Sequence, residues 1–313
     1  MTDASLFGVD VGGTKIRTAL ATADGSILAE RVEPTVGDSA TGLVELIAAA
    51  LARLREEAAS AGADGGPVAA AGVALPVGVD RVTGRLDSVH NIPGLAGADH
   101  LRADLEAALG MPVEMDNDAN AAVLAERARG VARGFDDVAV IAIGTGIGLG
   151  IVSGGRLVHG ARGMAGEIAF LPIGAPPSGT ETAYEAVVAG PGLRRRIDTA
   201  AGSDPSSRLW VGATFTDVVE LAAAGDATAA ALVDEEAGLI ALGISAVVAL
   251  LDPALVVLSG GVGSVPGLLD PVRRRLSDLV RVAPRIETGL LGERGPLVGA
   301  LELARQSRPA QRP

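Results

Sequence analysis

Acidic and amide side chains are concentrated in one short stretch, Asp116-Asn117-Asp118-Ala119-Asn120. This stretch follows a short extended segment at 111–115 and opens an Ala-rich run at 119–128 that is typical of a helix. A carboxylate at a strand-to-helix junction can accept a proton from a bound hydroxyl, while neighbouring amides hold the rest of a polar ligand. Asp and Asn are also preferred helix N-caps, so capping is the competing interpretation.

Two glycine-rich turns between predicted strands are candidates for binding phosphate. Glycine lets the backbone approach an anion closely, and successive N–H groups at such turns point inward. In the first turn Thr14 and Lys15 add donors, and Asp10 fits a divalent cation held through water. Two ordinary tight hairpins are the competing interpretation. The candidate residues are Asp10, Gly12, Gly13, Thr14 and Lys15 in the first turn, and Gly144, Thr145 and Gly146 in the second.

A third glycine stretch, Ser259-Gly260-Gly261-Val262-Gly263, follows an apolar strand. It marks another place where the backbone could approach a ligand closely. The stretch indicates a ligand site only in combination with the other two turns.

The elements that position these residues form a strand, glycine turn, strand, strand, helix unit that occurs twice. The mixture of strands and helices predicts an α/β fold, and the hairpin opening differs from a Rossmann unit. The predicted strands cover 6–10, 16–21, 26–32, 68–75, 112–115, 138–143, 149–152, 156–159 and 255–258. The predicted helices cover 41–62, 98–109, the run after Asp118, 180–189, 216–224, 227–251, 266–279 and 297–305.

Composition excludes several classes of protein. The 313 residues are 48% hydrophobic, which is incompatible with a disordered chain. A net charge of −12 argues against nucleic acid or an anionic membrane as a partner. The chain has no Cys, and its longest apolar stretch, 237–251, is shorter than the ~18 residues that span a bilayer. With no visible signal peptide, we expect a cytoplasmic protein.

Taken together, these motifs resemble the ROK family of bacterial sugar kinases and repressors. The resemblance runs in order over nearly the whole chain and implies the actin-like ATPase (ribonuclease H-like) fold, with two duplicated α/β domains and ATP and sugar in the cleft between them. The matching segments are Asp10–Lys15, Asn117–Asn120, Gly144–Gly148, Gly163–Glu167 and Ser259–Val262.

From this resemblance we expect residues 1–116 and 297–313 to form a small domain with the first phosphate turn. Residues 117–296 would form a large domain with the second turn, the sugar-binding segment and a homodimer surface. ATP and Mg²⁺ are the expected co-substrate and metal.

The resemblance also implies roles for single residues. Asp118 matches the base that deprotonates the sugar hydroxyl, and Asn117 matches a residue that hydrogen-bonds neighbouring hydroxyls. Glu167 and Glu185 match two sugar-binding glutamates, against the competing interpretations of a solvated loop carboxylate and an exposed helix residue. Asn91 is a further candidate substrate contact.

One departure from the family concerns zinc. After Glu167 the chain reads Ile-Ala-Phe170, where the family has a His that ligates zinc and touches the sugar, and the Cys ligands are also missing. We therefore expect no structural zinc, and a loop held by packing of Phe170, Leu171 and Ile173. The rigid residues that would help are Pro172, Pro176 and Pro177.

These features lead us to expect an ATP-dependent hexose kinase with glucose as the default substrate. An amino sugar or a cyclitol is the alternative, because Phe170 changes the pocket. A repressor would carry an N-terminal winged helix, for which the turn at Asp10 leaves no room. A non-catalytic sugar sensor is the alternative of another class. We interpret the three histidines, His90, His100 and His159, as surface or loop residues.

Overall fold

The computed structural model describes residues 4–35, 39–63, 66–80, 83–87, 95, 98, 100–173 and 183–307. Asn91, Pro176 and Pro177 lie outside these residues. The chain divides into two compact units. Unit 1 contains Met1–Ala128, His159–Ala165 and Arg294–Pro313; unit 2 contains Arg129–Val158 and Gly166–Glu293.

Unit 1 is built on a five-stranded sheet in the order β3-β2-β1-β4-β7. The first three strands along the chain are antiparallel neighbours, whereas β4 and β7 run parallel to β1. The strands are β1 (Ser5–Val11), β2 (Lys15–Ala21), β3 (Ile27–Pro34), β4 (Val68–Leu75) and β7 (Val113–Asn117). The three-strand opening that the sequence predicts is therefore confirmed.

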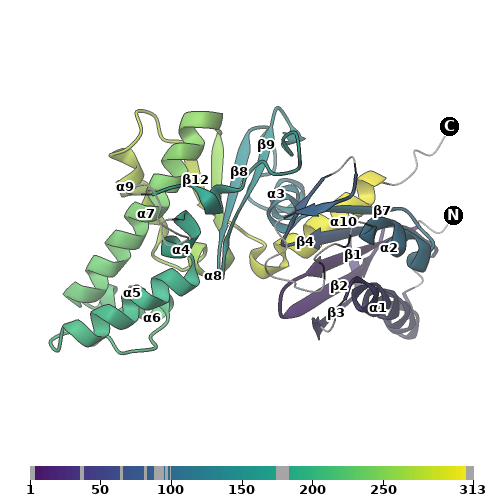
Figure 1. Ribbon diagram of the computed structural model, residues 1–313, viewed down its shortest axis with the longest axis horizontal. Coiled ribbons are helices and arrows are strands. Elements are labelled where there is room, and N and C mark those ends of the chain that lie inside the picture. Colours follow the sequence, from purple (N-terminus) through teal and green to yellow (C-terminus); the bar gives the residue numbers. More distant parts are fainter. Residues whose placement is uncertain are drawn as a thin grey trace. The chain divides into compact units, whose positions relative to one another are not determined.

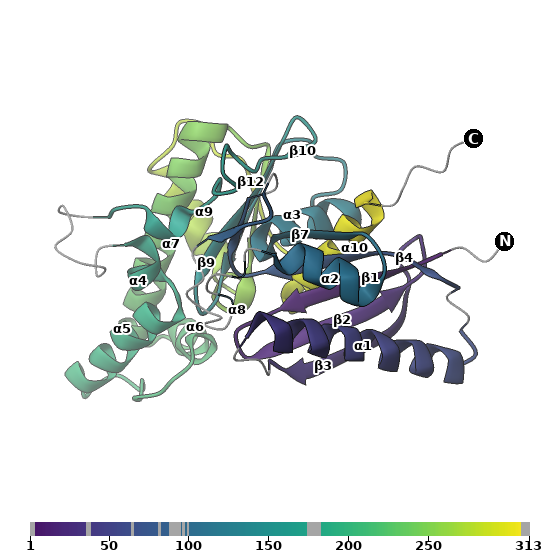
Figure 2. The same ribbon diagram turned by 45° about the vertical axis from the view of Figure 1, so that its right-hand side comes forward.

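Helices cover both faces of this sheet (Figure 2). On one face α1 (Ala40–Ser60) and α2 (Leu101–Leu109) pack against the side of β1 that carries Phe7, Val9 and Val11. On the other face lies α10 (Gly295–Ser307), against Leu6. A Cβ at Gly72 of β4 would lie 1.9 Å from the Ala300 carbonyl oxygen, so the backbone of α10 rests directly on the sheet.

Residues 118–128 of the helix α3 (Asp118–Arg129) belong to unit 1, whereas the sequence led us to expect a domain boundary between residues 116 and 117. It packs closely on α10, because a Cβ at Gly299 would lie 1.9 Å from the carbonyl oxygen of Ala121. Ala74, Ala121, Ala300 and Leu303 form a small buried cluster between β4 and these two helices. Because three of these four side chains are alanines, β4, α3 and α10 pack closely next to the junction at 116–120. After β4 the short strands β5 (Gly78–Val79) and β6 (Leu86–Asp87) pair antiparallel; neither was predicted from the sequence.

Unit 2 contains a second sheet, of which β8, β9 and β12 are labelled in Figure 1. It repeats the sheet of unit 1, with the order β10-β9-β8-β11-β12 and the same strand directions. Its strands are β8 (Val138–Ile143), β9 (Ile147–Ser153), β10 (Arg156–Leu157), β11 (Leu255–Ser259) and β12 (Arg285–Thr288). The duplication read from the sequence is therefore present, although β12 was not predicted. That strand has a single fully buried apolar residue, Ile286, and so leaves little periodicity to detect.

The helices of unit 2 form one core with the sheet around the long α7, whose bounds match the sequence prediction. Asp226 caps the start of α7 by accepting a hydrogen bond from the Ala229 N–H at 3.0 Å. In the part of the chain that the structure describes, no helix is both long and apolar enough to cross a membrane. The helices are α4 (Tyr184–Val188), α5 (Gly190–Ser203), α6 (Phe215–Ala223), α7 (Ala227–Leu251), α8 (Gly260–Gly263) and α9 (Leu269–Ser277), with the short 3₁₀ turns η2 (Ile168–Phe170) and η4 (Gly292–Arg294).

Candidate active site

The junction between β7 and α3 is organised by a buried carboxylate, Asp116, which is 2% exposed. Its Oδ1 accepts hydrogen bonds from the Asn117 N–H at 2.8 Å and from the Asn120 side-chain amide at 2.7 Å. A buried charge is tolerated when its oxygens are hydrogen-bonded. These bonds hold the chain direction at the point where the strand becomes a helix.

Asn117 and Asp118 occupy that turn. The Asn117 Oδ1 accepts a hydrogen bond from the Ala119 N–H at 2.8 Å, while its Nδ2 donates to the Val77 carbonyl at 3.3 Å. The capping interpretation therefore applies to Asn117. Asp118 is the first residue of α3 and is half-buried. The predicted base and its amide neighbour are thus adjacent at a well-supported helix start.

His159 also contacts the β7–α3 junction, and this contact was not predicted from the sequence. Its Nε2 lies 2.8 Å from Asp116 Oδ2, and the His159 side chain is 17% exposed. His159 lies in a loop, as the sequence indicated, but its side chain is not on the surface, because it packs against a buried carboxylate. The two residues lie 43 positions apart, so no local pattern could have connected them.

The first phosphate turn is the β1–β2 hairpin. The Gly12 N–H donates to the Lys15 carbonyl at 2.9 Å, and a Cβ at Gly12 would lie 2.9 Å from that same oxygen. Gly13, Thr14 and Lys15 are exposed at the tip. Thr35 steadies the turn: its Oγ1 donates to the Gly12 carbonyl at 2.6 Å and its N–H to the Thr14 carbonyl at 3.0 Å.

The second turn is the corresponding β8–β9 hairpin of unit 2, closed by a hydrogen bond from the Gly144 N–H to the Gly146 carbonyl at 2.9 Å. Glu185 supports it, since its Oε2 accepts a hydrogen bond from the Ile147 N–H at 2.9 Å. A Cβ at Gly146 would lie 2.7 Å from that oxygen. Thr145 is exposed at the tip. Glu185 is therefore tied to the phosphate turn, a contact that the sequence did not predict.

The third glycine stretch lies beside the second turn. Gly260 has φ +81°, and a Cβ there would lie 2.4 Å from the Ile143 carbonyl oxygen, at the end of β8. Instead of an open loop, Gly260–Gly263 forms the short helix α8. Gly261 is exposed, and its N–H nitrogen is the nearest atom, at 3.9 Å, to a Cβ built on Gly144. Unit 2 thus brings two glycine stretches and Glu185 together.

Glu167 precedes the 3₁₀ turn η2 in unit 2 and is half-buried. Leu171 and Ile173 pack against the core of unit 2, as expected. Phe170 does not, because it is 59% exposed, so the expectation that it helps to hold this segment is wrong. The segment is joined to α4 by a bridge between Pro172 and Ala183.

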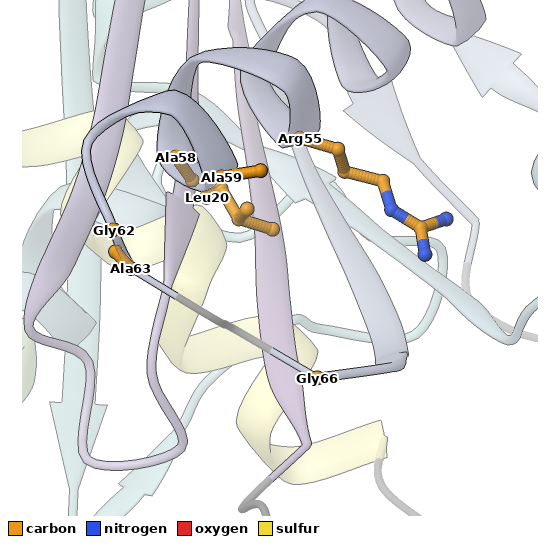
Figure 3. Close-up of a pocket in the computed structure, with 7 residues that line it drawn as sticks. All are labelled: Leu20, Arg55, Ala58, Ala59, Gly62, Ala63 and Gly66. Carbon is orange, nitrogen blue, oxygen red and sulfur yellow. The ribbon is translucent and has the colours of Figure 1, made fainter.

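The cavity drawn in Figure 3 lies elsewhere. It has a volume of about 370 Å³, is lined mainly by small residues near the end of α1, and has Arg55 as its charged group. Its described lining contains no predicted site residue. Within the described ranges, no group of three or more His, Asp or Glu side chains could hold a metal ion.

The predicted site residues are shared between the two units. Unit 1 carries the first phosphate turn with Asp10, together with Asn117 and Asp118. Unit 2 carries the second turn, the Gly260–Gly261 stretch, Glu167 and Glu185. The duplicated sheet therefore presents an equivalent glycine hairpin after the first strand of each unit.

Such a duplicated sheet, with a glycine hairpin in each half, defines the actin-like ATPase class of phosphotransferases. The ROK family matches residues 6–307 of the chain. A ROK family glucokinase from Streptomyces griseus, solved with glucose and AMPPNP, is 30% identical with a TM-score of 0.77, covering 97% of this chain and 100% of that one. The chain belongs to the ROK family and is a sugar kinase.

Two further relatives indicate the range of substrates in the family. A glucokinase of Halalkalibacterium halodurans is 32% identical over 247 residues, which is 75% of this chain and 73% of that protein. An N-acetylgalactosamine kinase of a Shewanella species is 30% identical over 219 residues, 66% of this chain and 68% of that protein. The class of substrate that these relatives support is a hexose or an amino sugar.

Proposed function

We propose that this sugar kinase transfers the γ-phosphoryl group of ATP to a hydroxyl of a hexose, with glucose as the leading substrate and Asp118 as the general base. The observation that carries the proposal is the β7–α3 junction. There the buried Asp116 carboxylate holds the backbone of Asn117, and the Asn117 side chain caps the helix that Asp118 begins. A half-buried carboxylate held at a rigid helix start suits proton abstraction from a bound hydroxyl.

The reaction needs one group that accepts the hydroxyl proton and several positively charged or N–H groups that stabilise the phosphate charge. The hydroxyl oxygen attacks the γ-phosphorus, the bond from that phosphorus to the β,γ-bridging oxygen breaks, and ADP leaves with this oxygen. The hydroxyl proton passes to the Asp118 carboxylate. Lys15 and the backbone N–H groups of the two glycine turns would stabilise the phosphate charge. Bound Mg²⁺ would neutralise part of this charge, and Asp10 would hold it through water.

Asn117 retains the capacity to contact the sugar. An amide nitrogen has two donor hydrogens and an amide oxygen two acceptor sites. The described contacts use one of each, toward Val77 and Ala119. One donor and one acceptor site are left for substrate hydroxyls. Glu167 and Glu185 are the other proposed sugar contacts in the described part of the chain, and Asn91 is proposed from the sequence alone.

An amino sugar is the second candidate substrate. The similarity to an N-acetylgalactosamine kinase supports it. Phe170 also supports an amino sugar as substrate. Its exposed phenyl ring offers no hydrogen bond to a sugar hydroxyl, so it discriminates only weakly against a sugar in which an amino group replaces that hydroxyl. A cyclitol fits the same argument. A homodimer is a further prediction that rests on the family resemblance, and a cytoplasmic location is a further prediction from the sequence.

A panel assay tests the proposal. ADP release would be measured with Mg²⁺-ATP and glucose, N-acetylgalactosamine, N-acetylmannosamine or myo-inositol, and the product would be identified by ³¹P NMR. We expect glucose to give the highest kcat/KM and the product to be a sugar monophosphate. A higher kcat/KM for an amino sugar would change the substrate assignment. Substrate binding without ADP release for every compound would indicate a non-catalytic sugar sensor.

A further inference from the structure

The segment His159–Ala165, called the 159–165 loop below, belongs to unit 1, although the residues on both sides of it belong to unit 2. The Ala165 N–H donates to the His159 carbonyl at 3.0 Å and closes the loop on itself. Gly160 and Gly163 have φ values of +73° and +77°, a conformation that other residues rarely adopt. The loop is therefore a defined turn, and Glu167 follows it by two residues.

Two contacts fasten this loop to the rest of unit 1. At Gly163 an added Cβ would lie 2.1 Å from the Val79 carbonyl oxygen, so the loop backbone lies directly against β5. At the other end, His159 Nε2 meets Asp116 Oδ2 at 2.8 Å. An ionised carboxylate can only accept a hydrogen bond, so with Asp116 in that form the donor of this contact is Nε2.

These contacts converge on the residues that carry the proposed chemistry. The Oδ2 atom of Asp116 contacts His159 Nε2, while its Oδ1 accepts hydrogen bonds from the Asn117 N–H and the Asn120 side-chain amide. Asn117 in turn donates to Val77, two residues before the Val79 carbonyl that packs against Gly163. The β7–α3 junction, the 77–79 segment and the 159–165 loop thus form one connected cluster within unit 1.

We propose that His159 and Asp116 are a pair of positioning residues for sugar binding. Their hydrogen bond fixes the 159–165 loop against the junction that holds Asn117 and Asp118, and it anchors the chain two residues before Glu167. This inference rests on the proposed roles of Asp118 and Glu167. Neither member of the pair touches the substrate; both act through the residues that they hold in place.

Two substitutions at His159 test whether its hydrogen bond to Asp116, and not only the volume of its side chain, is needed for sugar binding. In His159→Gln the side-chain amide can reach Asp116 as a donor, whereas in His159→Asn the same amide is one methylene too short. We expect His159→Asn and His159→Ala to raise the KM for the sugar about 10-fold or more, the usual effect of losing a hydrogen bond to a buried charge. The KM for ATP should change less than 3-fold in these variants, and His159→Gln should stay close to the parent.

His100→Ala is the matched control, since His100 precedes α2 and its side chain makes no capping hydrogen bond. Circular dichroism would check that each variant is folded. If His159→Ala does not fold, the comparison of the Gln and Asn variants decides the question. Equal KM values for the sugar in His159→Gln and His159→Asn would overturn the proposal. A rise of the KM for ATP in parallel with the KM for the sugar would also overturn it.

Trypsin gives a second readout that does not depend on catalysis. Arg162 is exposed at the tip of the 159–165 loop, so release of the loop should speed cleavage after Arg162. Mass spectrometry should find this cleavage accelerated about 10-fold or more in His159→Asn, and unchanged in His159→Gln and His100→Ala. Unchanged cleavage in His159→Asn would refute the anchoring. If the parent phosphorylates no sugar, the proposed function fails, whereas the anchoring is still decided by this digestion.

Discussion

Gly146→Ala tests whether Glu185 supports the second phosphate turn. Position 146 requires glycine because Glu185 lies too close for a side chain: a Cβ at Gly146 would lie 2.7 Å from Glu185 Oε2. Real Cβ atoms essentially never show so short a contact. The Glu185 carboxylate must therefore move, and its hydrogen bond from the Ile147 N–H at 2.9 Å is lost or stretched.

The size of the effect follows from that bond. A hydrogen bond to a charged group contributes about 1.5–3 kcal/mol. Glu185 is half-buried, and partial exposure to water reduces the contribution, so we expect about 1.5 kcal/mol. If the turn binds nucleotide only in its supported conformation, this loss corresponds to roughly a 10-fold weaker affinity.

Isothermal titration with AMPPNP and Mg²⁺ would measure the affinity. Gly202→Ala in α5 of the same unit is the control, because a Cβ there meets no described atom within 4 Å. This control should bind AMPPNP as the parent does and should be slightly more stable, since Ala is the better helix former. Nucleotide affinity within 2-fold of the parent in Gly146→Ala would refute the reasoning, because it would mean that the Glu185 contact does not shape the turn.

Three further outcomes are expected. Gly12→Ala, whose Cβ would lie 2.9 Å from the Lys15 carbonyl oxygen, should weaken AMPPNP binding about 10-fold or more in the same titration; unchanged binding would reduce the first turn to an ordinary hairpin. Burial raises the pKa of Glu236 to about 7 against the opposing effect of Arg196, so the folded protein keeps a proton that the unfolded chain releases near pH 4.5. The free energy of unfolding should then fall by about 3 kcal/mol as the pH rises from about 4.5 to 7, and Glu236→Gln should remove this slope in urea titrations; an identical slope in both proteins would contradict it. Elemental analysis should find no stoichiometric zinc in the purified protein, and one zinc per chain would contradict the interpretation of the segment after Glu167.

Most of the fold could be predicted because its signals are local. The strand at Val68–Leu75 and the helix at Ala227–Leu251 have the bounds that the sequence predicts, since long apolar runs end at Pro76 and at Asp252. The helix Gly190–Ser203 was missed because it begins with Gly-Pro-Gly and carries three consecutive arginines. The strand Arg285–Thr288 was missed because tertiary pairing with β11, and not its own composition, makes it a strand.

The site could be predicted only as a set of separate motifs. Glycine spacing indicated both turns, but it could not show that Thr35 braces the first or that Glu185 braces the second. The pairing of His159 with Asp116 depends on a loop that returns to unit 1 far along the chain. Phe170 was expected to hold the segment after Glu167 by apolar packing, yet at the end of a 3₁₀ turn it is exposed. Contacts between distant segments follow from the fold and leave no trace in local sequence.

Single-turnover phosphoryl transfer by Asp118→Asn tests the central claim most directly. Asp104→Asn is the matched control, since Asp104 also lies in the first turn of a helix of unit 1 but is exposed. With the best substrate of the panel, Asp118→Asn should bind sugar and AMPPNP within a few-fold of the parent. It should transfer the phosphoryl group about 10²–10⁴-fold more slowly, the usual contribution of a positioned general base. Transfer within a few-fold of the parent rate would contradict the assignment of Asp118 as the base.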